Sequence, residues 1–229
     1  MKYFKVVESL SSDVIIDTKT TNYSLTLVDK DRHFEFLNCI IQSSKELDLP
    51  FDFYFTLNNN LAMFGNEYLR NLPRSNNGVF EILQLTQNIN HRNLFIEESD
   101  LIFLVEKIDK IGISFFEKGY YLWEHILEDI RLLNYPDKPS RQKSFFLFDN
   151  IESCKYYINN HIRIGTICEV KLLEINSLFK ADMNWLDTIP SKFTIKQANQ
   201  QVENYWMGNS MGAPLFEYLF QGKCMLIPI

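Results

Sequence analysis

The chain has 229 residues, of which 46% are hydrophobic and 14% aromatic, so it is long and apolar enough to fold around a core. Its net charge of −6 and its pI of about 5.3 disfavour a partner with a phosphate backbone. No apolar window reaches the length of about 20 residues that crosses a bilayer, and residues 1–5 do not resemble a signal peptide. We therefore expect a cytoplasmic α+β protein with no membrane contact.

The cysteines lie far apart in apolar runs, which is the ordinary setting of buried free thiols: Cys39, Cys154, Cys168 and Cys224. They form no CxxC pair and have no histidine at a metal-binding spacing, so we expect no metal site and a reducing compartment. The four histidines are also scattered, and His125 lies on an amphipathic segment where a structural role is the better interpretation. The phosphate-loop, dinucleotide-binding and zinc-protease motifs are absent.

Hydrophobic alternation predicts several strands in the first 55 residues, at 3–7, 13–17, 23–28 and 51–55. Between the last two, apolar residues at helical spacing predict a helix that begins at Asp31 and ends at Pro50. Residues 57–95 contain Asn-rich and Gly-containing segments, so we interpret them as loops around short helices.

From Ser99 the pattern is helical again, and a second helix is predicted from about Tyr120 to Leu133. Its periodicity places three residues inward, Trp123, Leu127 and Ile130, and three outward, Glu124, Glu128 and Arg131. Pro136 and Pro139 end this helix, and we expect a change of structural layer near residues 136–140. The remainder is typical of short strands, at 144–148, 164–173 and 223–227, with Asn150 capping a helix after the first of them.

One carboxylate stands out in the C-terminal segment. Glu217 lies in an apolar run that continues through a predicted turn at Gly222 into the last strand. Burying a carboxylate is costly unless it has a partner, so its presence between Phe216 and Leu219 calls for an explanation. From spacing alone, a glutamate at the edge of a sheet that faces water is the simpler interpretation.

The segment around Glu217 resembles the last motif of the ADP-ribosyltransferase fold, a glutamate followed by an aliphatic pair, a Gly turn and a final strand. Residues 1–7 and roughly 116–229 also resemble an uncharacterised bacterial family associated with that fold. The resembling stretches include Tyr135–Phe146, Ala181–Asp187 and Tyr205–Gly208. The resemblance implies one domain over 1–229, with a mixed or antiparallel split sheet. Its NAD-binding core would be 1–30 and 136–229, and 31–135 would be a largely helical insertion.

The resemblance also implies roles for individual residues. Glu217 would be the catalytic carboxylate, which stabilises positive charge on the ribose as the nicotinamide bond breaks. Ser144 would be its partner on the second strand, although a serine that satisfies its own backbone fits equally well. The implied contacts to NAD are Arg141, Phe146, Trp206, Lys5 and Tyr3. Core packing is the simpler interpretation of the two aromatic residues Phe146 and Trp206, and a solvent-facing position explains Arg141 equally well. Lys5 stands where the family usually has His or Arg, and this departure raises doubt about NAD binding.

The function implied by the resemblance is mono-ADP-ribosyl transfer from NAD to a protein or nucleic-acid acceptor. Compact bacterial enzymes of this type often act as toxins or phage-defence effectors, and the insertion would then select the acceptor or bind a regulator such as an antitoxin. Two alternatives stay open. The Lys5 departure favours a binding module that has lost turnover, and an NAD hydrolase would use the same site with water as the acceptor.

Overall fold

The computed structural model describes most of the chain, with gaps in its first half. The described residues are 1–21, 45, 53, 64, 67, 70–71, 79–84, 92–97, 99, 102, 106, 120–162, 164–190 and 193–229. The predicted strand at 23–28 lies outside them, as does Cys39 and all of the helix predicted between Asp31 and Pro50 except Lys45, which is helical.

The chain divides into two compact units. Unit 1 comprises Met1–Asp29, Glu124–Ile189 and Gln200–Ile229, and unit 2 comprises Lys30–Trp123 and Pro190–Asn199. Most of the helix at 120–134 belongs to unit 1, whereas the resemblance placed it in the insertion at 31–135.

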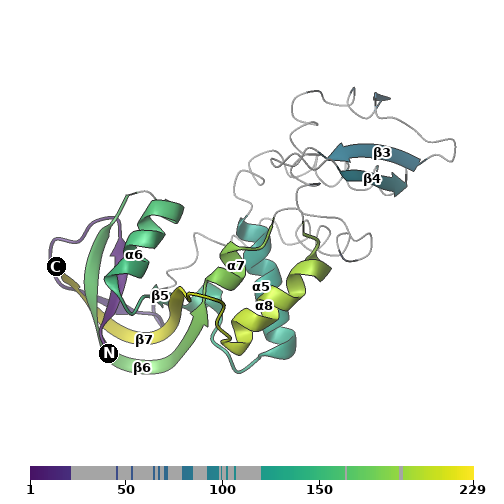
Figure 1. Ribbon diagram of the computed structural model, residues 1–229. Helices are drawn as coiled ribbons and strands as arrows, with labels where there is room; N and C mark the ends of the chain where they lie inside the picture. The colour runs from purple at the N-terminus through teal and green to yellow at the C-terminus, as the bar shows by residue number, and fades with distance from the viewer. Residues whose placement is uncertain are drawn as a thin grey trace. The chain divides into compact units, whose positions relative to one another are not determined.

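Unit 1 is an α+β structure around an antiparallel sheet (Figure 1). Its strands are β1 (Tyr3–Val7), β2 (Val14–Asp17), β5 (Phe145–Leu147), β6 (Thr166–Asp182) and β7 (Phe216–Pro228). The order is β1-β6-β7-β2, and β5 pairs with β7 beside β2. The helical elements are α5 (Tyr120–Asn134), the 3-10 helix η3 (Arg141–Lys143), α6 (Ile151–Tyr157), the π-helix η4 (Ile158–Ile162), α7 (Asn184–Asp187) and α8 (Ile195–Met207), of which α5 and α8 also contribute residues to unit 2.

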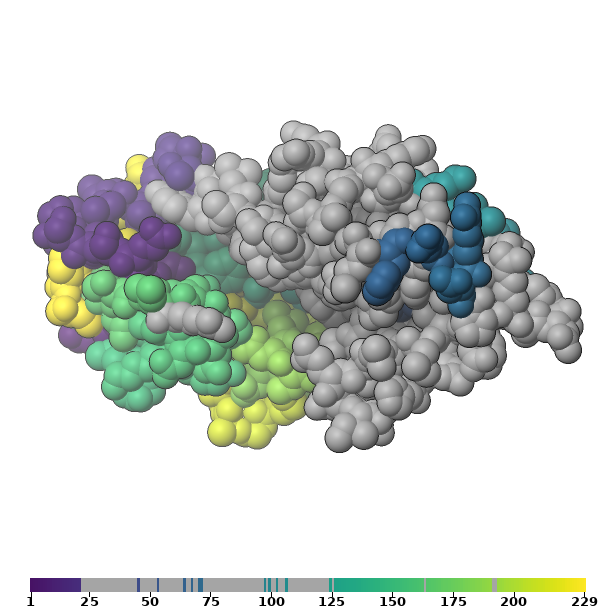
Figure 2. All heavy atoms as spheres, turned by 90° about the horizontal axis from the view of Figure 1, so that it is seen from above, coloured from purple at the N-terminus to yellow at the C-terminus, as the bar shows by residue number. Residues whose placement is uncertain are grey.

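The sheet curves until its two edges meet. Phe4 and Phe148 exchange two backbone hydrogen bonds of 2.8 Å, which join β1 to the end of β5. The strands β1, β6, β7 and β5 therefore form a closed ring. Figure 1 shows β6 and β7 bending together through this curve, and Figure 2 shows the N-terminal residues, in purple, beside the green residues of α6 and β6.

Gly222 allows β6 and β7 to stay paired through the bend. The register between these strands shifts between Leu172 and Glu174 and again between Ile175 and Ser177. Gly222 lies opposite Ile175 with φ of 146°, and an added Cβ would lie 2.0 Å from the carbonyl oxygen of Glu174. Only glycine fits so close to a neighbouring backbone. The predicted Gly turn is therefore wrong, because β7 runs unbroken from Phe216 through Gly222.

The two faces of the sheet bury different clusters. The inner face of the ring carries Tyr218 and Phe220 of β7 with Phe145 and Leu147 of β5. The opposite face carries Leu219, against which Val202, Tyr205 and Trp206 of α8 and Leu127 of α5 pack. Farther along this face, Phe4 and Phe148 pack against Cys154 of α6. Strand alternation therefore sends Glu217, two residues before Leu219, to the helix-covered face.

Several sequence predictions are confirmed in this unit. The helix of α5 has the predicted bounds within a residue, and Asn150 caps α6 by accepting a 2.7 Å hydrogen bond from the Ser153 amide. Cys154, Cys168 and Cys224 are buried free thiols. The outward placement of Glu124, Glu128 and Arg131 is wrong, since all three are buried. Their charges are paired, which periodicity alone does not reveal.

Two predictions in the first half of the chain are also wrong. Residues 57–95 were interpreted as loops around short helices, but β3 (Val79–Gln84) pairs antiparallel with β4 (Arg92–Glu97). Both segments carry β-branched or aromatic residues that favour strands. Phe53, expected in a strand, lies in a helix and is 1% exposed. A short apolar run does not distinguish a strand from a buried helix. Among the described residues, no helix has both the length and the apolar character to cross a bilayer.

Gly222→Ala should lower the free energy of unfolding by about 3 kcal/mol, because the methyl group collides with the β6 backbone. Chemical denaturation followed by circular dichroism measures this loss. Gly212→Ala is the matched control, since Gly212 also has a positive φ, of 56°, but has no atom within 4 Å of an added Cβ. It should cost about 1 kcal/mol. Equal losses in the two variants would contradict the close approach at Gly222.

Candidate functional site

The candidate site is a buried network around the carboxylate of Glu217. Glu217 is 4% exposed and lies near the start of β7, opposite Ala181 of β6. Its Oε1 atom accepts a 2.6 Å hydrogen bond from the Tyr205 hydroxyl and another from Nη1 of Arg141. Both bonds use the same oxygen. Within the described residues, Oε2 accepts no hydrogen bond.

Arg141 connects this carboxylate to a second one. Its Nε atom donates to both oxygens of Glu124, at 3.1 and 3.0 Å, and Nη2 donates to Oε1 at 2.9 Å. Nη1 donates to the Tyr205 hydroxyl as well as to Glu217. The guanidinium carbon lies 4.8 Å from the centre of the Phe146 ring. One guanidinium thus joins α5, α8 and β7 to the 3-10 helix that carries it.

The charges of this network stabilise one another. Burial alone would lower the pKa of Arg141, but the carboxylates of Glu124 and Glu217 raise it well above its ordinary value. Burial and then the charge of Glu217 raise the pKa of Tyr205, while Arg141 opposes the rise. Arg141 therefore stays charged and Tyr205 stays neutral at physiological pH. In these states the tyrosine accepts from Arg141 and donates to Glu217.

A second buried arginine shapes the segment that carries Arg141. Arg131, near the end of α5, pairs with Glu128 at 2.9 Å and donates to the carbonyl oxygens of Pro136 and Lys138, at 3.2 and 2.8 Å. These bonds hold the turn that leads from α5 to η3. The turn in turn fixes where Arg141 enters the network.

Asp182 fixes the segment that leads into Glu217. It is fully buried and accepts backbone hydrogen bonds from Asn184, Met211 and Leu215, at 3.1, 2.8 and 3.0 Å. The Asp182 carboxylate, at the end of β6, thereby fixes the backbone of the segment that leads into β7. Trp185 adds a bond from its indole nitrogen to the carbonyl oxygen of Asn209, at 2.9 Å.

Ser144 lies beside Gln221, which is farther along β7 than Glu217, the predicted partner of Ser144. Its hydroxyl donates to the carbonyl oxygen of Ser140 at 2.7 Å and accepts from Nε2 of Gln221 at 3.3 Å. Gln221 is four residues beyond Glu217, which corresponds to about 13 Å along a strand. Ser144 is therefore placed to hold the start of β5 rather than to touch the Glu217 carboxylate.

The two predicted aromatic contacts differ in their exposure. Phe146 is half-buried beside Arg141, on the same face as Glu217. Trp206 is completely buried; its ring stacks on Phe179 at 5.9 Å and its indole nitrogen donates to the carbonyl oxygen of Leu127 at 3.1 Å. A side chain with no exposed surface cannot wall a ligand site, so Trp206 is a core residue, as the simpler interpretation had it.

Lys5 and Tyr3 belong to the opposite face of the sheet from Glu217. Tyr3 packs edge-on against Tyr218, with ring centres 5.1 Å apart, and the Lys5 ammonium lies 4.7 Å from the centre of the Phe145 ring. Phe145 and Tyr218 line the inner face of the ring. Burial lowers the pKa of Lys5 from 10.5 to about 8, while the charge of Glu217 opposes this fall. Neither residue shares the face on which Glu217 meets Arg141.

Two members of the network were missed by sequence reasoning. Glu124 was assigned to the solvent face of α5, and Tyr205 was treated only as the end of a helix. Arg141 lies between two carboxylates because the fold brings together residues that are 17 and 76 positions apart in the sequence. Within the described residues, no group of three or more His, Cys, Asp or Glu side chains is placed to hold a metal ion.

The fold and this network define an α+β protein with a buried carboxylate on an antiparallel sheet. A family model matches residues 51–229, more than half of the chain, and the chain therefore belongs to that family, which is described as a protein of unknown function (DUF2441). The match includes residues 51–115, a segment that carries none of the motifs that resemble the ADP-ribosyltransferase fold. A comparison with curated proteins gave no match.

Lys5→Met should raise the free energy of unfolding at pH 7 by about 1–2 kcal/mol, because it removes a charge that folding drives into an apolar interior. The folded pKa lies below the unfolded one, so the cost of the ammonium is complete below pH 8 and disappears as pH rises to 10.5. Denaturation at pH 7 and pH 10 measures the difference between the two proteins. A difference that does not shrink at pH 10 would contradict this account of Lys5.

Proposed function

We propose that this protein is an NAD-dependent mono-ADP-ribosyltransferase in which Glu217 is the catalytic carboxylate. The observation that carries the proposal is the position of Glu217, on the helix-covered face of an antiparallel sheet with one carboxylate oxygen held by Arg141 and Tyr205. The three strands in which the resemblance implied catalytic positions, β1, β5 and β7, also belong to one sheet. The fold proposed with it is the split sheet of that enzyme class.

The geometry suits the chemistry of this reaction. The bond between nicotinamide and ribose breaks, nicotinamide leaves with the electron pair, and positive charge develops on the ribose. Arg141 and Tyr205 fix Oε1, so the carboxylate of Glu217 is oriented before the reaction. Oε2, which accepts no hydrogen bond within the described residues, is then available for a ribose hydroxyl. The acceptor bonds to the same ribose carbon and loses its proton.

Only some of the other residues predicted to contact NAD belong to the proposed site. Phe146 lies beside Arg141 and is half-buried, so it supports a role next to the nicotinamide ring. Arg141 already binds two carboxylates, so we assign it to positioning Glu217 rather than to the phosphates of NAD. Lys5 and Tyr3 lie on the other face and have no part in the proposed site. We infer that the acceptor is a protein or a nucleic acid, in a cytoplasmic setting typical of a toxin or phage-defence effector.

A binding module without turnover is the second candidate. One observation favours it, since Glu217 is only 4% exposed and its charge is already matched by Arg141. In that case the network has a structural purpose and the family retains the fold for partner binding, for example of a regulator. Wild-type protein and a Glu217 variant would then both leave NAD intact.

The decisive comparison uses purified wild type and Glu217→Gln, incubated with labelled NAD and a cell lysate that is split into protein and nucleic-acid fractions. We expect label in one fraction and a loss of about 100-fold in the variant, the usual effect of removing one electrostatic stabiliser. Glu169→Gln is the matched control, because Glu169 is a sheet carboxylate in a surface pair with Lys2. It should keep full activity.

Other outcomes separate the candidates. Nicotinamide release without retained label assigns the site to NAD hydrolysis. Equal label in wild type and Glu217→Gln contradicts the role of Glu217. Intact NAD with both folded proteins supports the binding module.

A further inference from the structure

His161 and Asp187 form an accessible pair outside the Arg141 network. Nε2 of His161 lies 3.2 Å from Oδ2 of Asp187, and the two side chains are 33% and 22% exposed. His161 belongs to η4, which continues α6, and Asp187 is the last residue of α7. Helical turns of the π type are rare and recur at functional sites. This pair therefore reaches solvent, whereas Tyr205 is fully buried.

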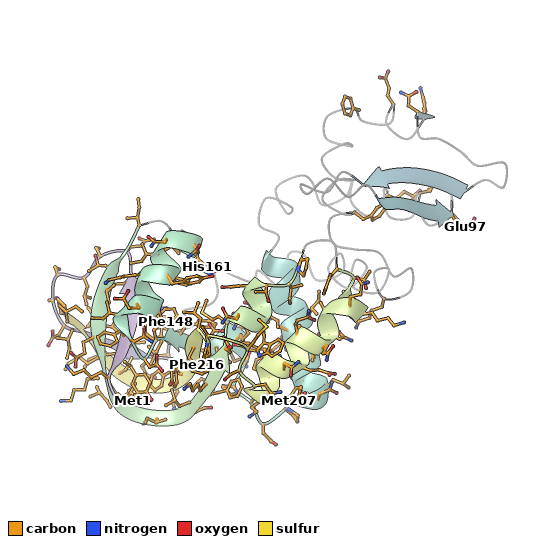
Figure 3. The ribbon with its side chains drawn as sticks, in the orientation of Figure 1. Met1, Glu97, Phe148, His161, Met207 and Phe216 are labelled. Carbon is orange, nitrogen blue, oxygen red and sulfur yellow. The ribbon has the colours of Figure 1, made fainter. Side chains whose placement is uncertain are left out.

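Ring contacts connect His161 to the strand position of Glu217. The His161 ring stacks on Tyr157, with centres 5.1 Å apart and planes at 24°, and Tyr157 lies 5.5 Å from Phe148. Phe148 follows Leu147, which pairs with Tyr218, so the register of β5 and β7 places Phe148 across from Glu217. Figure 3 shows Phe148 below α6 and His161 at the end of the same helical segment.

Asp187 is connected to the same end of β7 from the other side. Ala181 pairs with Glu217 in the sheet, and the Met183 amide donates to the carbonyl oxygen of Leu215 at 2.8 Å. The Asp187 amide then donates to the carbonyl oxygen of Met183 at 2.9 Å. The histidine and its carboxylate therefore belong to two elements that are both tied to the beginning of β7.

The pKa of His161 depends on the charges of both Asp187 and Glu217. The hydrogen bond with Asp187 raises the pKa of His161, burial opposes the rise, and the charges of Asp187 and then Glu217 add to it. Among the described residues, Tyr156 and Tyr157 of α6 also face the pair. Burial raises the pKa of both hydroxyls, and the charge of Asp187 and a hydrogen bond with it add to the rise for Tyr156. A histidine whose charge is felt by Glu217 and whose side chain is accessible is suited to proton transfer near neutral pH.

We propose that His161 is the general base for the acceptor in the transfer reaction, and that Asp187 is its positioning residue. This inference rests on the proposed function of Glu217. When Asp187 accepts the proton-bearing Nε2, the lone pair lies on Nδ1. The acceptor nucleophile forms its bond to the ribose carbon as the bond to nicotinamide breaks, and its proton passes to Nδ1. Asp187 then stabilises the imidazolium, while Glu217 stays with the ribose.

The test is the pH dependence of label transfer from NAD by the full chain, for wild type, His161→Gln, Asp187→Asn and Asp187→Glu. We expect the wild-type rate to rise with pH as His161 loses its proton. His161→Gln should lower the rate about 100-fold and remove this rise, because a positioned base contributes at least that factor. Asp187→Asn should move the rise to lower pH, and Asp187→Glu should restore it.

A purely structural pair would not produce this pattern. Glu152→Gln is the matched control, since it breaks the exposed pair of Glu152 and Lys155 on α6 and should leave the profile unchanged. A His161→Gln variant with the wild-type rate and profile would overturn the role of His161 while the proposed function stands. Absence of transfer and of nicotinamide release by wild type would overturn both.

Discussion

The burial of Arg141 between two carboxylates is the constraint on which the rest of unit 1 depends. Each buried ion costs several kcal/mol unless it is paired with good geometry, so none of the three charges can be buried alone. Arg141 satisfies Glu124 through three hydrogen bonds and shares its remaining nitrogen with Tyr205 and Glu217. The 3-10 helix, α5, α8 and β7 must therefore meet at one point for the fold to form.

The closed sheet determines which side chains face the point where these elements meet. The bonds between Phe4 and Phe148 close the ring, and Gly222 lets β6 and β7 follow the curve without losing their pairing. Alternation along β7 then divides the residues between an apolar interior and the helix-covered face. Glu217 lies on the helix-covered face because it is two residues from Leu219, and side chains two residues apart on a strand share a face. On β1 the same alternation places Lys5 on the inner face of the ring. The face on which a residue lies, rather than its strand, decides whether it can join the site.

Local sequence patterns predicted the positions of helices and caps well, but they predicted the contacts between these elements poorly. The helix at 120–134, the cap at Asn150 and the buried thiols follow from periodicity and from the chemistry of single residues. The strands β6 and β7 extend beyond the predicted segments at 164–173 and 223–227. For β7 the reason is that Gly222 was taken as a turn, whereas its freedom lets the strand continue beside the backbone of Glu174.

The candidate site shows the same limit. Spacing alone favoured a water-facing Glu217, which is wrong because the residue is 4% exposed. The catalytic role of Glu217 and the NAD contact of Arg141 were predictions from the family resemblance. Glu124 appeared to face solvent because helical periodicity counts a charged residue as exposed, although it is buried against Arg141. Ser144 was assigned to the correct strand end but four positions from Glu217 in register, as its bond to Gln221 reveals. Pairing partners and register are tertiary properties that spacing along one segment does not contain.

The most direct test of the buried network is a double-mutant cycle on the free energy of unfolding, with Arg141→Met, Glu217→Gln and the combined variant. The cycle isolates the Arg141–Glu217 interaction, since the loss of the Glu124 pair is common to both variants that lack Arg141. We expect a coupling energy of about 2–3 kcal/mol, because each single change leaves a buried charge or donor unmatched. Additive effects within about 0.5 kcal/mol would mean that the two side chains do not interact, and would contradict the network.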